Sequence, residues 1–335
     1  MTPTASPWTP FKGTCRSPTG PYGVGLAIKR VLSYRGAKLE ATIQEAPVYE
    51  RDLLAADADG LAPHKPCTDV LLKGTVVAPL GARSGSGSLS IAGVRKQVRV
   101  FGERRIRADA RGVRFEEVEP LREAKLSFVN AYGGTLPLER KRRRGFGATD
   151  DEAPPFDPRN PVGRGFVLGD RVALLDGALA PSQEDPSDPI KPERVIRKVQ
   201  EDDWDRGPAP ASFGPIDWSW QPRVDHLLRE RQGPDPKVLS CAPPGLAFPH
   251  LEGRVEAQLT GFRWGRGEVR LDLDLRAPRA RLDFPGAGAF EVRCHLATLL
   301  FDTDEESVTE VWGGFQPTAM PYPEDQLQDV KLTLL

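Results

Sequence analysis

Apolar and polar residues alternate over several short stretches in the N-terminal part of the chain. The valines of 94–100 share one face of an extended chain, while Arg95, Gln97 and Arg99 share the other. A period of two is typical of a β-sheet with one face in water. Stretches of this kind, rich in β-branched residues and separated by Gly, Asp and Pro, predict strands at 27–34, 38–43, 68–79 and 89–104. The sequence GARSGSGS (81–88) predicts a flexible hairpin loop between two of them.

The same alternation returns toward the C-terminus. In LDLDL (271–275) the leucines are expected to face a core while Asp272 and Asp274 face water. LFDTDEESVTEVW (300–312) predicts a hairpin with DTDEES as its turn. The predicted strands of this region lie within 254–264, 268–284, 290–302 and 307–315.

Between residues 133 and 250 the periodicity is lost. Disordered segments are usually poor in aromatic residues, whereas this one holds Trp204, Trp218 and Trp220. We therefore predict an ordered, loop-rich segment lying over a β framework, with one short helix at 225–232.

These patterns predict a mainly β fold with antiparallel, sandwich-like sheets, a long ordered loop-rich middle segment and few short helices. The N-terminal β region (1–132) and the C-terminal β region (251–335) are expected to pack together, with 133–250 between them in sequence. The 33 glycines and 33 prolines among 335 residues are too many turn-formers for a helical bundle.

Charge and cysteine usage narrow the class of protein. A net charge of -1, from 46 Lys and Arg against 47 Asp and Glu, argues against a surface built for nucleic acid. The start has no signal-peptide pattern and no window holds 18 apolar residues, so we expect no membrane partner and a cytoplasmic location. The four cysteines form no CxxC pair and are expected to be reduced thiols in the core.

Residues suited to catalysis or metal binding form no recognisable pattern. The four histidines include no HExxH pair, and GVGLAIKR (23–30) lacks the third glycine of a dinucleotide-binding loop. We therefore expect no metal, no cofactor and no catalytic residue. A hydrolase whose carboxylates meet only in the fold stays an alternative.

Arginine and tryptophan are the residues that dominate protein interfaces. The run RKRRR (140–144) predicts a solvated loop tip that docks an acidic partner, with nucleic acid or phosphate binding as the alternative. The stretch FGPIDWSWQPR (213–223) predicts a second binding loop, unless its rings cover the core beneath the long loop. The candidate protein-binding residues are Arg142, Arg143, Phe213, Trp218, Trp220 and Arg223.

The stretch RNPVGRGF (159–166) has the composition of an ordered turn. An asparagine before a proline is held extended and can start a turn through its side chain. The two glycines allow positive φ or a close approach of another backbone, and the arginine between them can donate to several carbonyl groups or to a carboxylate. We interpret Asn160, Pro161, Gly163, Arg164, Gly165 and Phe166 as a structural loop, with ligand binding as the alternative.

Seven segments in order resemble the bacterial family known as domain of unknown function 2169. They are KPCTDVLLKGTVVAP (65–79), VRKQVRVFGER (94–104), AYGGT (131–135), NPVGRGF (160–166), FGPIDWSWQPR (213–223), APP (242–244) and DTDEESVTEVWGG (302–314). The resemblance spans about residues 20–320. This family usually has a Glu-Arg pair before its AxGGT motif, where the present chain has Val129 and Asn130. The segment between QPR and APP is also shorter here and lacks the usual Tyr-Asp and Trp pattern.

The family is associated with type VI secretion, so the resemblance implies a non-catalytic effector adaptor or chaperone. Such a protein holds a toxic effector in the cytoplasm and helps to load it onto the spike protein or its tip. Two other functions stay open. A hydrolase-type enzyme would need a deep pocket with carboxyl groups of raised pKa, and a structural component of the injection machine would assemble into its particles.

Overall fold

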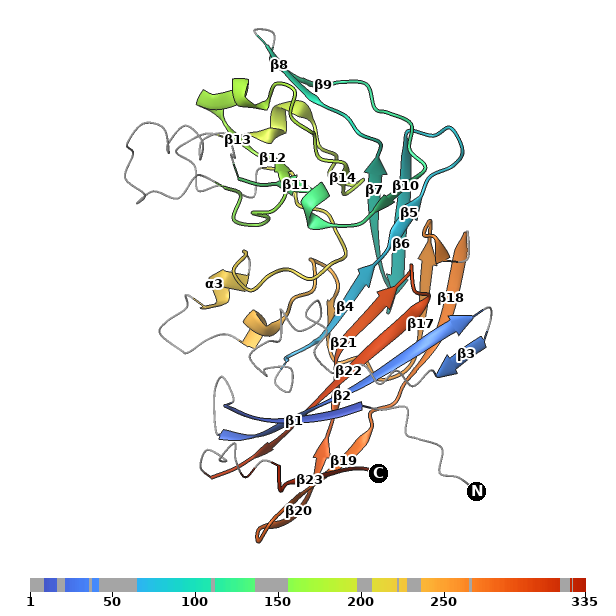
Figure 1. The fold of residues 1–335 in the computed structure, drawn as a ribbon, viewed down its shortest axis with the longest axis vertical. Coiled ribbons are helices and arrows are strands. Elements are labelled where there is room, and N and C mark those ends of the chain that lie inside the picture. The colour runs from blue at the N-terminus through green and yellow to red at the C-terminus, as the bar shows by residue number, and fades with distance from the viewer. Residues whose placement is uncertain are drawn as a thin grey trace.

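The largest sheet joins strands from both ends of the chain. In the computed structural model it has seven strands in the order β1-β2-β22-β21-β4-β16, with β3 also beside β2 (Figure 1). The strands are β1 (Thr9–Arg16), β2 (Tyr22–Arg35), β3 (Lys38–Ala41), β4 (Thr68–Lys73), β16 (Ala247–Phe248), β21 (His295–Asp302) and β22 (Ser307–Pro317). Among the described strands of this sheet, β4 and β21 pair in parallel and the other neighbours are antiparallel. The description covers residues 9–16, 22–35, 38–41, 65–109, 112–135, 156–197, 207–221, 223–227, 236–264, 267–319, 326 and 328–335.

A second sheet has five strands in the order β14-β7-β6-β17-β18, and a third has three in the order β20-β19-β23. The bounds in the five-stranded sheet are β6 (Ser84–Ile91), β7 (Val94–Phe101), β14 (Gln183–Glu184), β17 (Gly253–Thr260) and β18 (Glu268–Leu275). Those in the three-stranded sheet are β19 (Arg279–Phe284), β20 (Gly288–Arg293) and β23 (Lys331–Leu334). All of these pairs are antiparallel.

One hydrophobic core lies between these sheets. It joins Leu26 of β2, Leu89 of β6, Leu273 of β18 and Leu282 of β19 in a single buried cluster. Side chains of β18 alternate as predicted, because its leucines at 271, 273 and 275 are buried and the aspartates at 272 and 274 are exposed. The mainly β, antiparallel, sandwich-like prediction is confirmed, and so is the hairpin of 300–312, whose turn lies between β21 and β22.

The prediction of a flexible loop at 81–88 is wrong, because the strand β6 begins at Ser84. A Cβ on Gly87 would come within 2.7 Å of the Phe262 ring, and one on Gly261 within 1.9 Å of the Ser86 carbonyl oxygen. The glycines therefore allow the 261–262 segment to pack closely over the strand. A glycine-rich composition suggests a flexible loop, whereas these glycines leave room for a neighbouring segment to pack against the strand.

Short elements of residues 106–135 and 156–197 lie to one side of the large sheets (Figure 1). They share a small core, which includes Ile106, Tyr132, Val167, Leu175 and Val195. Their paired strands are β8 (Ile106–Asp109) with β9 (Gly112–Phe115), β11 (Tyr132–Gly133) with β12 (Arg164–Gly165), and β13 (Val167–Leu168) with β15 (Ile196–Arg197). Within the predicted middle segment (133–250), β14 and β16 instead belong to the two largest sheets. β5 (Thr75–Val77) pairs with β10 (Glu123–Lys125).

The described helices are short, as predicted. The 3-10 helices are η2 (Phe128–Asn130), η3 (Gly169–Leu175), η4 (Pro192–Val195) and η6 (Pro236–Leu239). The α-helix α3 (Arg223–Leu227) overlaps the start of the helix predicted at 225–232, and residues 228–235 lie outside the described residues.

Candidate functional site

Three of the sequence motifs meet in one place, which we call the loop cluster (residues 128–135, 156–166 and 213–221). The side-chain nitrogen Nδ2 of Asn160 donates to the carbonyl oxygens of Phe128 at 2.9 Å and Tyr132 at 2.8 Å. The backbone nitrogen of Gln221 donates to the carbonyl oxygen of Pro158 at 3.0 Å. β11 of the AYGGT motif pairs in parallel with β12 of the NPVGRGF motif. These bonds join segments that are far apart in sequence.

The glycines of the loop cluster are required by close backbone contacts. A Cβ on Gly133 would lie 2.3 Å from the carbonyl oxygen of Asn160, and one on Gly134 would lie 2.3 Å from that of Gly163. Both residues also have positive φ, at 139° and 104°. Of the two glycines in NPVGRGF, Gly165 takes the predicted positive φ of 91°, whereas Gly163 instead approaches the amide of Asn160 closely.

Asn160 is fully buried and forms the centre of this arrangement. Its side-chain nitrogen donates hydrogen bonds to two carbonyl groups, whereas its side-chain oxygen Oδ1 accepts no hydrogen bond from any described residue. The sequence predicted a side chain that hydrogen-bonds forward to start a turn, whereas Nδ2 donates back to residues 28 and 32 positions earlier in the chain. A buried side chain that satisfies two main-chain carbonyl groups holds the loop in a single conformation.

Arg164 donates to one main-chain and one side-chain oxygen, where the sequence predicted several carbonyl groups or a carboxylate. Its Nε donates to the carbonyl oxygen of Val129 at 3.0 Å, and its Nη2 donates to Oδ1 of Asn130. Burial lowers the pKa of the guanidinium, an effect that the charge of Glu103 partly offsets. Val129 accepts through its main-chain carbonyl and Asn130 through its side-chain oxygen, so both of these acceptors are uncharged.

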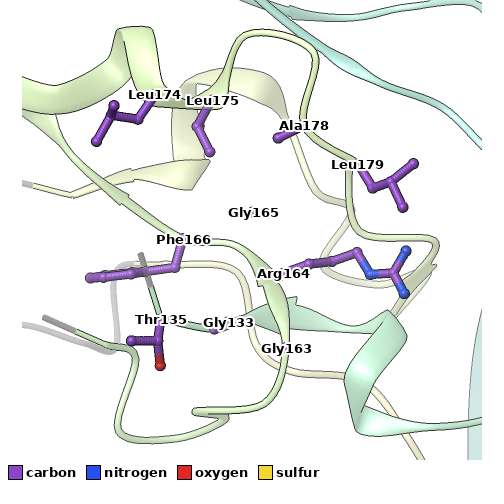
Figure 2. Close-up of a pocket in the computed structure, with 11 residues that line it drawn as sticks. Gly133, Thr135, Gly163, Arg164, Gly165, Phe166, Leu174, Leu175, Ala178 and Leu179 are labelled. Carbon is purple, nitrogen blue, oxygen red and sulfur yellow. The ribbon is translucent and has the colours of Figure 1, made fainter. Parts of the chain in front are cut away.

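A cavity of about 320 Å³ lies between the glycines of the loop cluster and the segment that ends η3. Figure 2 shows Leu174, Leu175 and Ala178 on one side of this space and Gly163, Arg164 and Phe166 on the other. The lining is mostly aliphatic side chains and glycine main chain, with Thr135 and Arg164 as its polar side chains. This arrangement suits an apolar group that carries a negative charge at one end.

The structure separates the four aromatic and arginine candidates of 213–223. Trp218 is 56% exposed, whereas Trp220 is half-buried and packs edge-on against Phe128 with ring centroids 5.5 Å apart. Phe213 is fully buried in the main core, and Arg223 is buried with its guanidinium donating to main-chain carbonyl groups. Phe213 and Arg223 therefore stabilise the fold and offer no surface to a partner. Arg142 and Arg143 lie outside the described residues.

Residues 26–313 match a family model described as "Uncharacterized protein conserved in bacteria (DUF2169)". The chain belongs to this family. Comparison with curated proteins and with solved structures found no match. The matched DUF2169 region contains the entire loop cluster.

The loop cluster of this DUF2169 chain is rich in exposed apolar side chains. Nine large hydrophobic side chains are exposed among the described residues, and four of them lie in this small part of the chain. We call these four the apolar patch: Val129, Phe156, Val162 and Trp218. Sequence analysis identified Trp218 but missed the other three, because single valines and phenylalanines carry no signal of exposure.

A second polar cluster, from the KPCTD motif, has the character of a structural crosslink. Asp69 is fully buried and pairs with Nζ of Lys65 at 3.0 Å, while the hydroxyl of Ser240 and the backbone nitrogen of Cys241 donate to it at 2.6 and 2.7 Å. Burial raises the pKa of Asp69, but the Lys65 charge and the hydrogen bonds together lower it below its ordinary value. The carboxylate oxygens are therefore occupied, which does not suit a general base.

A buried carboxylate of β22 is held in the same way. Glu310 is fully buried and receives two donors of Arg30, with Nη2 to Oε1 at 2.7 Å and Nε to Oε2 at 3.0 Å. The indole nitrogen of Trp312 also donates to Glu310, at 3.0 Å. The ion pair crosslinks β2 and β22.

No group of three or more His, Cys, Asp or Glu side chains among the described residues is placed to hold a metal ion. None of the described helices has the length and apolar character needed to cross a membrane. Cys67, Cys241 and Cys294 are not joined by disulfide bonds within the described residues.

Proposed function

We propose that this DUF2169 protein is a non-catalytic adaptor or chaperone of a type VI secretion system. It binds an effector protein in the cytoplasm and helps to load it onto the spike protein or its tip. The observation that supports this proposal is the apolar patch on the loop cluster. Large apolar side chains that gather at the surface mark sites of protein binding, and tryptophan is among the residues that contribute most there.

The way in which the patch is held also favours binding. Asn160 and Arg164 hold the main chain of the loops through hydrogen bonds, so the exposed side chains of these loops need little ordering when a partner binds. Preorganisation of this kind raises affinity because less conformational entropy is lost on association. The same binding energy stays moderate, since few side chains supply it, and this allows the effector to be handed on to the spike.

The test is co-purification with defined partners. The tagged protein is co-expressed with the toxin-like and spike proteins encoded beside its own gene, and the bound proteins are measured by quantitative mass spectrometry. We expect the wild type to retain one toxin-like protein. The double variant Trp218→Ala/Val162→Ser is expected to retain at least about tenfold less, because two exposed apolar contacts are lost.

The matched control is Leu80→Ser, since Leu80 is fully exposed but lies outside the loop cluster. It is expected to retain the toxin-like protein as the wild type does. If the wild type retains neither a toxin-like protein nor a spike protein, the adaptor function is contradicted. Stoichiometric incorporation into purified spike particles without an effector would instead assign the protein a structural role.

A further inference from the structure

The cavity beside the loop cluster has a floor of bare main chain. Gly133, Gly134 and Gly165 all line it, and all three have positive φ. A Cβ on Gly165 would meet the ring of Pro181 at 2.8 Å, so this position too is closed to other residues. The opposite wall is formed by Leu174, Leu175 and Ala178 at the end of η3 and just beyond it (Figure 2).

The size of the cavity limits what it can hold. Sites for drug-sized ligands measure roughly 300–1,000 Å³, so a cavity of about 320 Å³ is at the lower limit. One large aliphatic or aromatic side chain, with the backbone that carries it, fills such a space. An apolar group is favoured because leucine, alanine and glycine form most of the wall.

Arg164 adds a charge to one end of this apolar space. A guanidinium has five N–H groups, and acceptors among the described residues engage two of them, through Val129 and Asn130. Both of those acceptors are uncharged. The guanidinium is half-buried, and Glu103, whose charge acts on it, forms its own ion pair with Arg105. An incoming carboxylate therefore gains a charge-assisted hydrogen bond from Arg164.

The cavity also adjoins the apolar patch. Gly163 of its wall follows Val162 directly, and Thr135 of its wall pairs with Phe156 in an isolated antiparallel bridge. Two of the four patch residues therefore lie next to residues that line the cavity. A polypeptide that contacts Val162 and Phe156 therefore lies close to residues that line the cavity.

We propose that this cavity anchors a segment of the effector polypeptide, which inserts one apolar side chain and pairs an adjacent carboxylate with Arg164. The anchor rests on the proposed adaptor function for the identity of the polypeptide. The carboxylate belongs either to an Asp or Glu side chain or to the C-terminus of the segment, and the two sources share the same chemistry.

Four small probes test the chemistry without an effector. They are N-acetyl-leucine, which has a terminal carboxylate; N-acetyl-leucyl-glutamate amide, which has a side-chain carboxylate; N-acetyl-leucinamide, which has neither; and N-acetyl-glycine, which has no apolar side chain. Binding to the full chain is measured by saturation-transfer NMR titration. We expect at least one of the first two to bind, and N-acetyl-leucinamide and N-acetyl-glycine to bind about tenfold more weakly or not at all.

Variants locate the site. Ala178→Phe fills the cavity and is expected to abolish probe binding, while Arg164→Gln is expected to weaken carboxylate probes about tenfold and leave N-acetyl-leucinamide unchanged. The matched control is Ala173→Phe, because Ala173 is exposed on η3 and does not line the cavity. Circular dichroism and melting temperature verify folding, and if Ala178→Phe is unfolded, Ala178→Leu and Ala173→Leu replace the pair.

Absence of binding by both carboxylate probes, or equal binding by Ala178→Phe and wild type, would overturn the proposal. The adaptor function is tested separately by co-purification. If Ala178→Phe loses the probes but retains the effector as the wild type does, the effector is not anchored here and the adaptor function still holds. If the probes bind and no effector co-purifies, the adaptor function fails and so does the assignment of the segment to an effector.

Discussion

The side-chain nitrogen of Asn160 donates to the carbonyl oxygen of Tyr132 at 2.8 Å and thereby fastens the NPVGRGF motif to the AYGGT motif. The two residues are 28 positions apart, and both are fully buried. The contact explains why an asparagine stands at this position. A carboxylate at the same place would face the carbonyl oxygens with like partial charge.

Replacement of Asn160 by aspartate is therefore expected to destabilise the protein. Asn160→Asp removes both donated hydrogen bonds and leaves two carbonyl groups facing a carboxylate, so we expect a loss of about 3 kcal/mol in the free energy of unfolding at pH 7. Urea denaturation measures it. Asn130→Asp is the matched control, because its oxygen still accepts from Arg164 and the one bond that its Nδ2 donates, to the Lys125 carbonyl oxygen, is exposed. A loss of less than about 1 kcal/mol is expected there. Equal losses in the two variants would contradict the structural role of Asn160.

The glycine of AYGGT next to this contact makes a second prediction. Gly134→Ala combines a left-handed φ of 104° with a Cβ 2.3 Å from the Gly163 carbonyl oxygen, so the variant is expected to lose about 2–5 kcal/mol. Gly177→Ala provides the control, since Gly177 has φ 75° but nothing within 4 Å of an added Cβ. It is expected to lose only about 1–2 kcal/mol, the cost of the conformation alone. Thermal denaturation of both variants separates the cost of the contact from that of the conformation.

Breaking the buried pair of Lys65 and Asp69 on one side is expected to be costly. Asp69→Asn leaves the buried ammonium group without its counter-charge, so we expect a loss of about 3–5 kcal/mol in the free energy of unfolding. The double variant Lys65→Met/Asp69→Leu removes both charges and is expected to recover at least half of that loss. Chemical denaturation of the wild type, Asp69→Asn and the double variant measures the order of their free energies of unfolding. A double variant less stable than Asp69→Asn would show that the pair contributes more than mutual neutralisation.

The same pair is expected to make stability depend on acid pH. The folded-state pKa of Asp69 is lowered from its ordinary value of 3.8, despite burial, by the Lys65 charge and by donated hydrogen bonds. A lowered pKa contributes stability that is fully present above the unfolded value and is lost as pH falls through the folded value. The stability difference between the wild type and Lys65→Met/Asp69→Leu is therefore expected to shrink from pH 6 to pH 3. Urea titrations at several pH values measure this difference, and a difference that grows on acidification would contradict it.

The two tryptophans of 213–223 are expected to differ in their effect on stability. Trp220→Ala removes the edge-on contact with Phe128 and its half-buried area, so a loss of about 2 kcal/mol is expected. Trp218→Ala removes a ring that is more than half exposed, and a change of less than about 0.5 kcal/mol is expected. Melting temperatures of the two variants provide the comparison. A large loss for Trp218→Ala would place that ring in the core instead of at the surface.

Local patterns in the sequence determined much of the framework. The alternation in LDLDL predicted which face of β18 is buried, and DTDEES predicted the turn between β21 and β22, because both depend on residues close together in the chain. The seven motifs likewise indicated the family that the match over residues 26–313 confirmed. Such features are local in sequence, so a single chain is enough to recognise them.

Only the tertiary structure decided what the motifs do. The glycines near Gly87 lie in a strand because Phe262 packs over them. Trp218 is exposed, whereas Trp220, two residues later, is half-buried. The fold also places the side chain of Asn160 within hydrogen-bond distance of the Tyr132 carbonyl oxygen, and it places Leu174 and Gly133 around the same cavity. These outcomes depend on contacts between segments far apart in the chain. A side chain's exposure and partners follow from which distant residues pack against it, and no local pattern contains that information.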